Sequence, residues 1–403
     1  MNINTHKIST NEFVLLMALI TSLIALSIDA IMPAFPMMAK DLHVIRNNSI
    51  QSVIVYIFLG LAIGQLLFGP LSDIVGRKIP VITGLIIYIT GTLLALFSHH
   101  LDVMIVARIM EGIGLSGPRT ASIALVRDLY KGDNMARIMS FIMMIFIMVP
   151  IIAPTIGQFI LFFAGWRAIF CLLIVVACID LVWFAVRQPE TLPPDKRFSF
   201  SLNKLWFSMK EVLKNRQALG YTVAGGVING AFIGYLSLSQ PIFQGAYHLG
   251  STFPIFFALL AIAIGSASFF NGKLVVRFGA QKMTHYAAIM FTVCSAIFFL
   301  VVQMANGKPQ LWLLVVFMLI ILFSVGIMFG NQMALAMGSI GHVAGMGAAI
   351  VGASSTFIGA GIGMVIVHSF HQAVTPLAIA FALCGILTII AQYVARTTLN
   401  SSN

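Results

Sequence analysis

Five ionisable residues lie inside long apolar stretches of this chain: Asp29, Arg108, Glu111, Arg119 and Asp180. A charged side chain in hydrocarbon is costly unless it is paired, protonated or wet, so such residues are candidates for function by default. Asp29 is the clearest candidate, because the stretch from 13 to 35 is otherwise interrupted only by threonine and serine. A carboxyl group in such a place can take up and release a proton. The alternative is an acid at a helix end that reaches the lipid headgroups.

The spacing of these residues along the expected helices predicts which of them meet. At 1.5 Å per residue, Asp29 is about 24 Å from the start of its helix, and Arg108 is about 8 Å from the start of a helix running the opposite way. In a hydrocarbon core about 30 Å thick, both then lie at similar depth, and we expect them to be neighbours. Glu111 shares a helical face with Arg108. It could neutralise that arginine or carry a second proton, and both options stay open.

Arg119 follows Arg108 by eleven residues, so it projects from the same face about 16 Å deeper. It could hold a substrate, or it could pair with Asp180, which is expected at similar depth. We favour the pairing. Pro118 loosens the helix just before Arg119.

The second half of the chain has no aspartate or glutamate after Glu211. Proton coupling by a carboxylate is therefore assigned to the first half. The second half can offer only neutral polar groups and apolar walls to a substrate. Its candidate binding residues are Asn229, Tyr235, Gln240, Asn331 and Gln332, although buried amides also join helices to each other in lipid.

The elements that must position these residues are membrane-spanning helices. The chain has 403 residues, of which 60% are hydrophobic and 9% charged, a balance that a soluble domain does not have. Apolar runs of about 20 residues, each long enough to cross a bilayer, recur along the chain. We expect twelve spans, at 13–35, 50–71, 80–98, 103–126, 135–162, 167–186, 217–242, 252–274, 284–304, 311–335, 345–368 and 374–395.

The positive charge indicates topology and not a nucleic-acid partner. Most of the 23 lysines and arginines fall in loops on one side of the membrane if both termini are cytoplasmic. The first apolar run lacks an Ala-x-Ala cleavage site and is expected to be a span. The four cysteines lie inside apolar runs, and we find no phosphate-binding loop, nucleophilic triad or metal-ligand spacing. We therefore expect no enzyme activity, no cofactor and no metal.

A polar segment divides the chain into two halves of six spans. The predicted domains are 1–186, a cytoplasmic linker at 187–216, and 217–403. Within the linker, apolar residues from Leu202 to Leu213 share one helical face, which is typical of an amphipathic helix on the inner leaflet. The loops after the second and eighth spans also echo each other, which indicates a duplicated transporter architecture.

The loop after the second span carries the motif Gly69-Pro-Leu-Ser-Asp73-Ile-Val-Gly76-Arg77-Lys78. It resembles the loop signature of the major facilitator superfamily. Gly76 permits a tight turn, and Asp73 beside Arg77 and Lys78 makes a charged latch at the inner surface. The run Arg108-Ile-Met-Glu111-Gly112 resembles the family's buried-arginine signature, with Glu111 where glutamine is commoner.

The fifth span carries Pro150-Ile-Ile-Ala-Pro154-Thr-Ile-Gly157-Gln158, which resembles the antiporter signature of that family. Pro150, Pro154 and Gly157 are its expected hinge, whereas Ala153 and Gln158 replace expected glycines. With the motifs at 165–170 and 235–241, the chain is similar to the bicyclomycin/chloramphenicol-resistance (Bcr/CflA) group of drug:proton antiporters.

This resemblance implies an all-α membrane protein with the major facilitator fold, in which twelve transmembrane helices form two six-helix bundles around a central cavity. It implies efflux of amphiphilic drugs, such as amphenicol-like antibiotics, in exchange for protons across a bacterial inner membrane by alternating access. We expect membrane lipid as a partner and a functional monomer. The alternative is an importer of a small metabolite, proton-coupled or facilitative, with the same fold.

Overall fold

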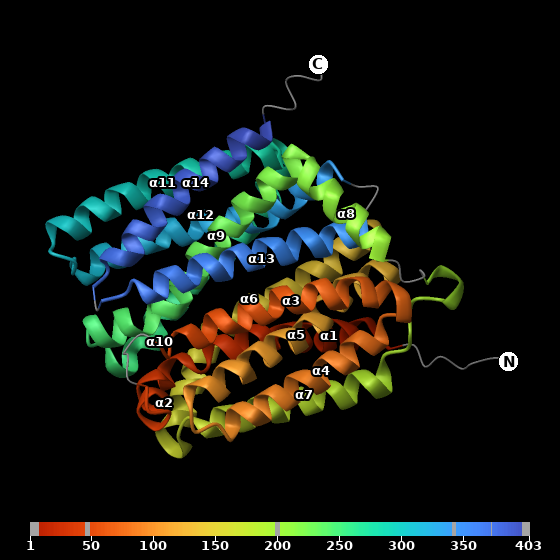
Figure 1. Cartoon of the computed structure of the whole chain (residues 1–403), viewed down its shortest axis with the longest axis horizontal. Helices are drawn as coiled ribbons and strands as arrows, with labels where there is room; N and C mark the ends of the chain where they lie inside the picture. The colour runs from red at the N-terminus through yellow and green to blue at the C-terminus, as the bar shows by residue number, and fades with distance from the viewer. Residues whose placement is uncertain (1–7, 45–48, 198–201, 341–343, 372, 397–403) are drawn as a thin grey trace. The chain divides into compact units, whose positions relative to one another are not determined.

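A computed structural model describes residues 8–44, 49–197, 202–340, 344–371 and 373–396, and within these ranges it contains helices and no strand (Figure 1). The expected all-α membrane protein is confirmed. The helices of the first half are α1 (Thr10–Asp29), α2 (Phe35–Asp41), α3 (Ser52–Val75), α4 (Lys78–Leu96), α5 (Leu101–Leu129), α6 (Gly132–Ala164) and α7 (Arg167–Arg187). The helices that follow are α8 (Leu202–Lys214), α9 (Arg216–Gln240), α10 (Phe253–Phe278), α11 (Ala280–Met304), α12 (Leu311–Gly338), α13 (Ala344–His368) and α14 (Thr375–Arg396).

Most predicted spans agree with these helices to within a few residues, but the first span differs. It was expected to continue to residue 35, whereas α1 ends at Asp29 and the chain goes on as a short 3-10 turn, Met32–Ala34, before α2. Pro33 explains the break, because it has no N–H to donate to the carbonyl group of Asp29. The candidate acid therefore lies at the last position of a helix, where backbone carbonyls lose their partners.

Eleven helices in the described ranges are long and apolar enough to cross a membrane. The predicted span at 103–126 corresponds to α5, which is long enough but carries more charge than the other spans. Its charges include Arg108, Glu111 and Arg119 in its interior and Asp102 and Asp128 near its ends. The helix that is least typical of a membrane span is thus the one that carries most of the candidate site.

The chain divides into two compact units, residues 1–44 with 59–201 and residues 45–58 with 202–403. The predicted domain boundaries at 186 and 217 stay a prediction. In the first unit α4 packs along α5, and α1 packs against α6 and α7. Gly84 and Gly114 permit this approach, since a Cβ at Gly84 would lie 2.5 Å from the carbonyl oxygen of Gly114.

In the second unit, α9 packs against α13 through a regular pattern of glycine and isoleucine. Gly226, Gly230 and Gly234 recur every four residues on α9, and each faces one isoleucine of α13. These isoleucines, Ile358, Ile362 and Ile366, have the same spacing. A ridge of branched side chains thus fills a groove of glycines, which is the close packing that small residues allow between membrane helices.

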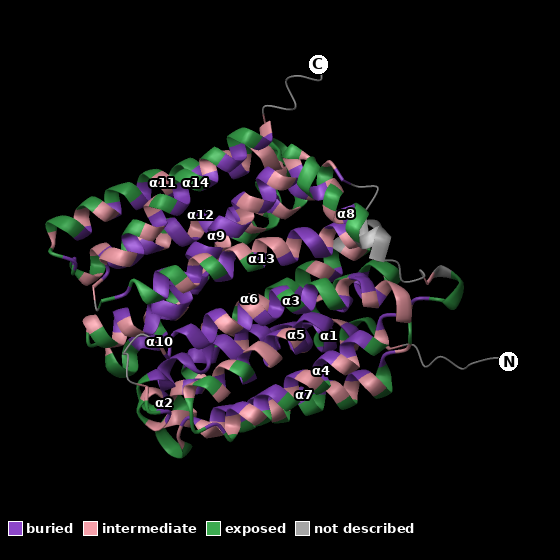
Figure 2. Cartoon of the chain, viewed as in Figure 1, coloured by how far each residue is buried: buried purple, intermediate pink, exposed green. Residues whose placement is uncertain are grey.

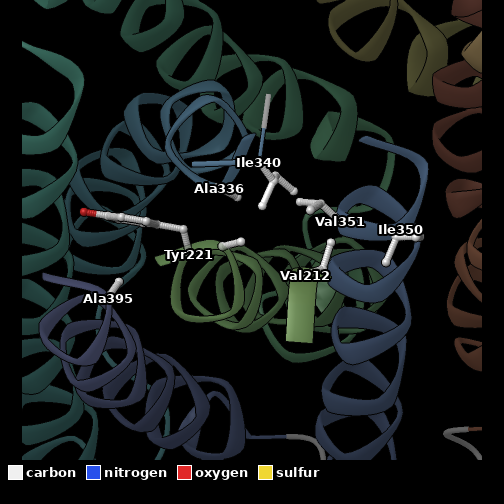
Figure 3. Packing of buried hydrophobic residues seen from close by; sticks show 8 residues of the cluster. Val212, Tyr221, Ala336, Ile340, Ile350, Val351 and Ala395 are labelled. Carbon is white, nitrogen blue, oxygen red and sulfur yellow. The ribbon is translucent and has the colours of Figure 1, made fainter. Parts of the chain in front are cut away.

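The helix predicted in the linker is α8, and it packs on the second unit. Val212 of α8 is buried in a cluster with Tyr221 of α9, Ala336 of α12 and Val351 of α13 (Figure 3). The predicted apolar face is thus divided, because Trp206 and Leu213 beside Val212 are 56% and 57% exposed on a side of α8 that faces away from the cluster (Figure 2). An amphipathic helix with this outward aromatic and aliphatic side suits a membrane surface.

Candidate functional site

Asp29 is buried at the end of α1, with only 3% of its surface exposed. Its Oδ1 atom has no hydrogen-bond partner among the described residues. A carboxylate oxygen without a donor is poorly stabilised as an anion in such surroundings, whereas a protonated carboxyl is tolerated. The position therefore favours a carboxyl group that changes its protonation state. It does not favour a carboxylate whose role is a structural salt bridge.

Arg108 approaches this end of α1 through the backbone. Because α1 ends at Asp29, the carbonyl of Ser27 has lost its helical partner, and Arg108 Nη1 donates to it at 3.3 Å. No hydrogen bond or ion pair joins Asp29 directly to Arg108 in the described chain. Arg108 thus fixes the backbone two residues before the acid. Arg108 and Asp29, which were expected to be side-chain neighbours, are therefore linked only through the carbonyl of Ser27.

The counter-charge of Arg108 is Glu111. Arg108 Nη1 donates to Glu111 Oε2 at 2.7 Å, and both side chains are fully buried. The guanidinium also lies 4.8 Å from the centre of the Phe170 ring of α7. Glu111 was expected either to neutralise Arg108 or to carry a second proton, and the structure shows the ion pair that the first role requires. A pair this deeply buried depends on good geometry, because removal of either partner leaves an uncompensated charge in a dry interior.

Tyr88 of α4 completes the polar core of the first unit. Its hydroxyl lies 2.7 Å from Ser27 Oγ, and Ser27 Oγ donates to the carbonyl of Leu23 at 2.6 Å. The single Ser27 proton is used in that second bond, so Tyr88 is the donor in the first. Ser27 therefore receives a hydrogen bond on its side chain from α4 and another on its carbonyl from α5. Three helices meet at the residue that precedes the acid by two positions.

The expected pairing of Arg119 with Asp180 is wrong. Both carboxylate oxygens of Asp180 are buried on α7 without a hydrogen-bond partner among the described residues, and Arg119 is exposed on α5. The estimate of equal depth says nothing about the direction in which each side chain leaves its helix. Contact with a substrate, the other role considered for Arg119, stays a prediction.

The hinge predicted in the fifth span lies within α6, which contains Pro150 and Pro154. Gly157 lies one turn further on, directly against α1. A Cβ at this position would overlap the carbonyl oxygen of Ala30, the residue that follows Asp29. The backbones of α6 and α1 thus touch next to the candidate acid, so a change in the bend of α6 bears directly on the end of α1.

The candidate binding residues of the second unit separate into different environments. Asn331 of α12 exchanges two amide hydrogen bonds with Asn271 of α10, at 3.0 and 2.8 Å, and so joins two helices. Gln240 donates to Gln244 Oε1 at 3.0 Å. Asn229 packs against Gly359 of α13.

The other two candidates, Tyr235 and Gln332, are both buried. Tyr235 stacks on Phe257, with ring centres 6.1 Å apart. Gln332 is 1% exposed, and neither atom of its amide has a hydrogen-bond partner among the described residues. An unsatisfied buried amide is costly, and a bound polar molecule would relieve that cost. The structure therefore favours Gln332 over Asn331 as a binding residue.

The four latch residues lie at the junction of α3 and α4, with Asp73 in the last turn of α3 and Lys78 at the start of α4, and Arg77 is bonded to two acids. Its Nη1 atom donates to Asp73 Oδ1 at 2.6 Å, and its Nε atom donates to Asp128 Oδ2 at 2.9 Å. Burial alone would lower the pKa of Arg77, but the hydrogen bonds to Asp73 and Asp128 raise it above its ordinary value. Gly76 has φ +103°, a conformation that favours glycine. Lys78 Nζ donates to the carbonyl of Ala185 at 2.6 Å.

Two acids of this latch were missed in the sequence, Asp128 and Glu190. Glu190 accepts four backbone hydrogen bonds: Oε1 accepts from Arg77, Thr191 and Leu192, each at 2.9 Å, and Oε2 accepts from Lys78 at 3.1 Å. It thereby supplies acceptors at the start of α4. The sequence did contain a signal for Asp128 and Glu190. Basic residues alone set the topology of such loops, so an acid in a loop indicates another role.

We expect Glu190→Ala to destabilise the protein by about 0.5–2 kcal/mol at pH 7, as the loss of a helix cap does. Partial burial alone would raise the pKa of Glu190, but the four N–H donors hold it below the ordinary value of 4.5. A lowered pKa gives stability that is complete above pH 4.5 and is lost as the pH falls through the folded value. Thermal unfolding of purified protein should therefore differ between wild type and variant at pH 7, and differ less at pH 3.5.

The control for this experiment is Asp195→Ala, which removes an exposed acid from the same segment. It should leave the unfolding midpoint unchanged. If Glu190→Ala also unfolds with the wild-type midpoint at pH 7, the four hydrogen bonds do not hold this segment against α4.

Comparison with known proteins agrees with the fold and the motifs. The family model described as Major Facilitator Superfamily matches residues 17–364. The bicyclomycin resistance protein homolog of Haemophilus influenzae is 26% identical over 400 residues, which are 96% of each chain. The chloramphenicol resistance protein of Pseudomonas aeruginosa is 27% identical over 276 residues, 67% of this chain and 64% of that one.

Among solved structures, a partially occluded inward-open form of the xylose transporter XylE from E. coli has a TM-score of 0.73 at 12% identity. The match covers 95% of this chain and 98% of that one, and at this identity it shows the fold alone. Fold and family together define a multi-pass membrane transporter and not an enzyme. The chain belongs to the Major Facilitator Superfamily, and its resemblance to the bicyclomycin/chloramphenicol-resistance group is confirmed.

Proposed function

We propose that this transporter exports small amphiphilic drugs, amphenicol-like compounds among them, in exchange for protons across a bacterial inner membrane, with both termini in the cytoplasm. The observation that carries the proposal is Asp29, a buried carboxyl with an unpartnered oxygen at the broken end of α1. Relatives named for resistance to bicyclomycin and chloramphenicol supply the substrate class.

Exchange requires that the drug and the proton compete. In our proposal Asp29 takes up a proton when it is open to the outside, and the arriving drug favours the deprotonated carboxylate when the site is open to the cytoplasm. A ligand shifts such an equilibrium only by its difference in affinity for the two states. Arg108 supports the cycle by holding the Ser27 carbonyl, so that the end of α1 keeps its shape whether Asp29 is charged or neutral.

We propose two rearrangements for the alternation between states. The hinge at Pro150, Pro154 and Gly157 would bend α6 against α1 beside Ala30. The latch centred on Arg77 would open and close at the inner surface, where Asp73 and Asp128 share the guanidinium. Arg119, Tyr235 and Gln332 are proposed to contact the drug, and the protein is proposed to act as a monomer in contact with membrane lipid.

Transport of labelled chloramphenicol into inside-out membrane vesicles tests this function. We expect accumulation against the drug gradient when the vesicle interior is acid, collapse of accumulation when an uncoupler removes the proton gradient, and release of protons from purified protein on addition of drug. The alternative importer would instead move its substrate out of such vesicles. It would make drug-sensitive cells no more resistant, which would contradict export.

A further inference from the structure

A cavity of about 520 Å³ lies at the inner end of the first unit, away from Asp29. It is formed by the first turns of α1, the end of α5 and the start of α6. This volume is within the range of sites for drug-sized molecules, roughly 300–1,000 Å³. Tyr130 contributes to its wall and contacts Phe13 of α1, with ring centres 5.6 Å apart, so the wall is tied to α1.

The lining of this cavity is amphiphilic. Leu15 and Phe141 are 44% and 40% exposed, although both are apolar. Beside them, among the residues that the structure describes, are the neutral amides Asn11 and Asn134 and one cation, Arg137. The guanidinium of Arg137 lies 5.7 Å from the centre of the Phe141 ring, so charge and apolar surface adjoin each other. No acid belongs to the lining among the described residues.

The charge of this lining selects its ligand. The first acid on α1, Glu12, is bonded to Arg187 and Trp183 and is not part of the lining. Among the lining residues that the structure describes, Arg137 is therefore the one ionised group, and it offers hydrogen-bond donors and a positive charge. Electrostatic complementarity favours a neutral or anionic molecule that carries an oxygen acceptor, and it disfavours a lipophilic cation.

The cavity also lies at the beginning of a continuous line on α1. The residues Asn11, Leu15, Leu19, Ser22, Leu26 and Asp29 follow at intervals of three or four, which places them on one face of the helix. Leu15, Leu19 and Leu26 along this line are less buried than most of their neighbours on α1, whereas Ser22 and Asp29 on the same line are buried. From Leu15 to Asp29 the line covers about 21 Å.

We propose that this cavity is a loading site, in which a neutral or anionic amphiphile binds to Arg137 before it moves along α1 to Asp29. The proposal rests on the proposed function for its direction, but not for its binding chemistry. It limits the substrates to molecules with an oxygen acceptor next to an apolar body. Chloramphenicol, which is neutral and has such oxygens, is the probe, and tetraphenylphosphonium is the cationic comparison.

The test measures how fast a water-soluble maleimide alkylates a cysteine placed in the lining by Asn134→Cys. Cys171 and Cys178, both exposed, are replaced by serine in all proteins compared. We expect chloramphenicol to slow alkylation several-fold and tetraphenylphosphonium to have no effect. Adding Asp29→Asn should leave this protection intact. Adding Arg137→Gln should raise the chloramphenicol concentration that gives half protection by about tenfold, the loss expected for a charged hydrogen bond.

Lys131→Gln is the matched control, because it removes a nearby exposed cation that does not line the cavity. In this variant, chloramphenicol should protect the cysteine at the same concentrations as in the parent protein. If Arg137→Gln folds poorly, Arg137→Lys is the second variant, and chloramphenicol should protect its cysteine almost as well as in the parent. Protection that is lost with Asp29→Asn but kept with Arg137→Gln would overturn the proposal, as would no protection at all. Protection without proton-driven efflux would contradict the proposed function and leave the loading site standing.

Discussion

Asp29→Asn should reduce proton-driven chloramphenicol efflux to the level of membranes that lack the transporter. Asparagine keeps the size and most of the polarity of the side chain, but it cannot bind or release the proton. The buried position favours a neutral side chain, so the variant should fold and insert as well as wild type. Exchange of labelled for unlabelled drug at equal concentrations needs no net proton movement, and we expect it to persist.

The measurement compares uphill uptake and drug exchange in the same inside-out vesicles, at matched amounts of protein. Asp102→Asn is the matched control, since it makes the same chemical change at an exposed acid in the first turn of α5. Uphill efflux that survives Asp29→Asn would remove Asp29 from the coupling mechanism. Loss of both uphill efflux and exchange would assign it to drug binding alone.

Breaking the buried ion pair of Arg108 and Glu111 should lower the free energy of unfolding more than Glu190→Ala or Arg187→Gln does. Arg108→Met leaves Glu111 without a counter-charge at a fully buried position, which typically costs about 3–5 kcal/mol. Glu111→Leu leaves Arg108 without its partner in the same way. The double variant Arg108→Met/Glu111→Leu removes both charges, so we expect it to recover much of the lost stability. It should not recover transport, because nothing then holds the Ser27 carbonyl.

Unfolding of the four proteins in detergent, followed as a double-mutant cycle, gives the interaction energy of the pair. The surface pair of Arg187 and Glu12 is the control. Its side chains are 43% and 20% exposed, and Arg187→Gln should cost only about 0–1 kcal/mol. If the double variant is as unstable as the sum of the two single variants, the two charges do not stabilise each other. If it transports at the wild-type rate, Arg108 has no part in the mechanism.

Much of the helical framework could be predicted from the sequence because hydrocarbon imposes its length on every apolar run. The nearness of Arg108 and Glu111 could be predicted as well, since three residues along a helix bring two side chains to one face. The end of α1 at Asp29 was only partly foreseen. Pro33 indicated a loosened backbone, but the expected span continued past it.

The contacts between helices could not be predicted with the same success. An estimate of equal depth could not predict whether Arg119 and Asp180 pair, because pairing also requires the rotation of α5 and α7 about their axes, which no apolar run records. The bond from Arg108 to the Ser27 carbonyl depends on a break in a different helix. Glu190 is more than 100 residues from the N–H groups of Arg77 and Lys78 that it caps. Such partners are a property of the folded chain.

The glycine groove of α9 has a mechanical consequence for the second unit. Each isoleucine of α13 is seated opposite one glycine, and the next equivalent seat is four residues away, about 6 Å along the axis. A slide of an ångström or two would press every branched side chain against backbone at once, so the pair resists gradual shear. The two helices should therefore move together as a rigid body that keeps its register. Bending must then occur in other parts of the unit.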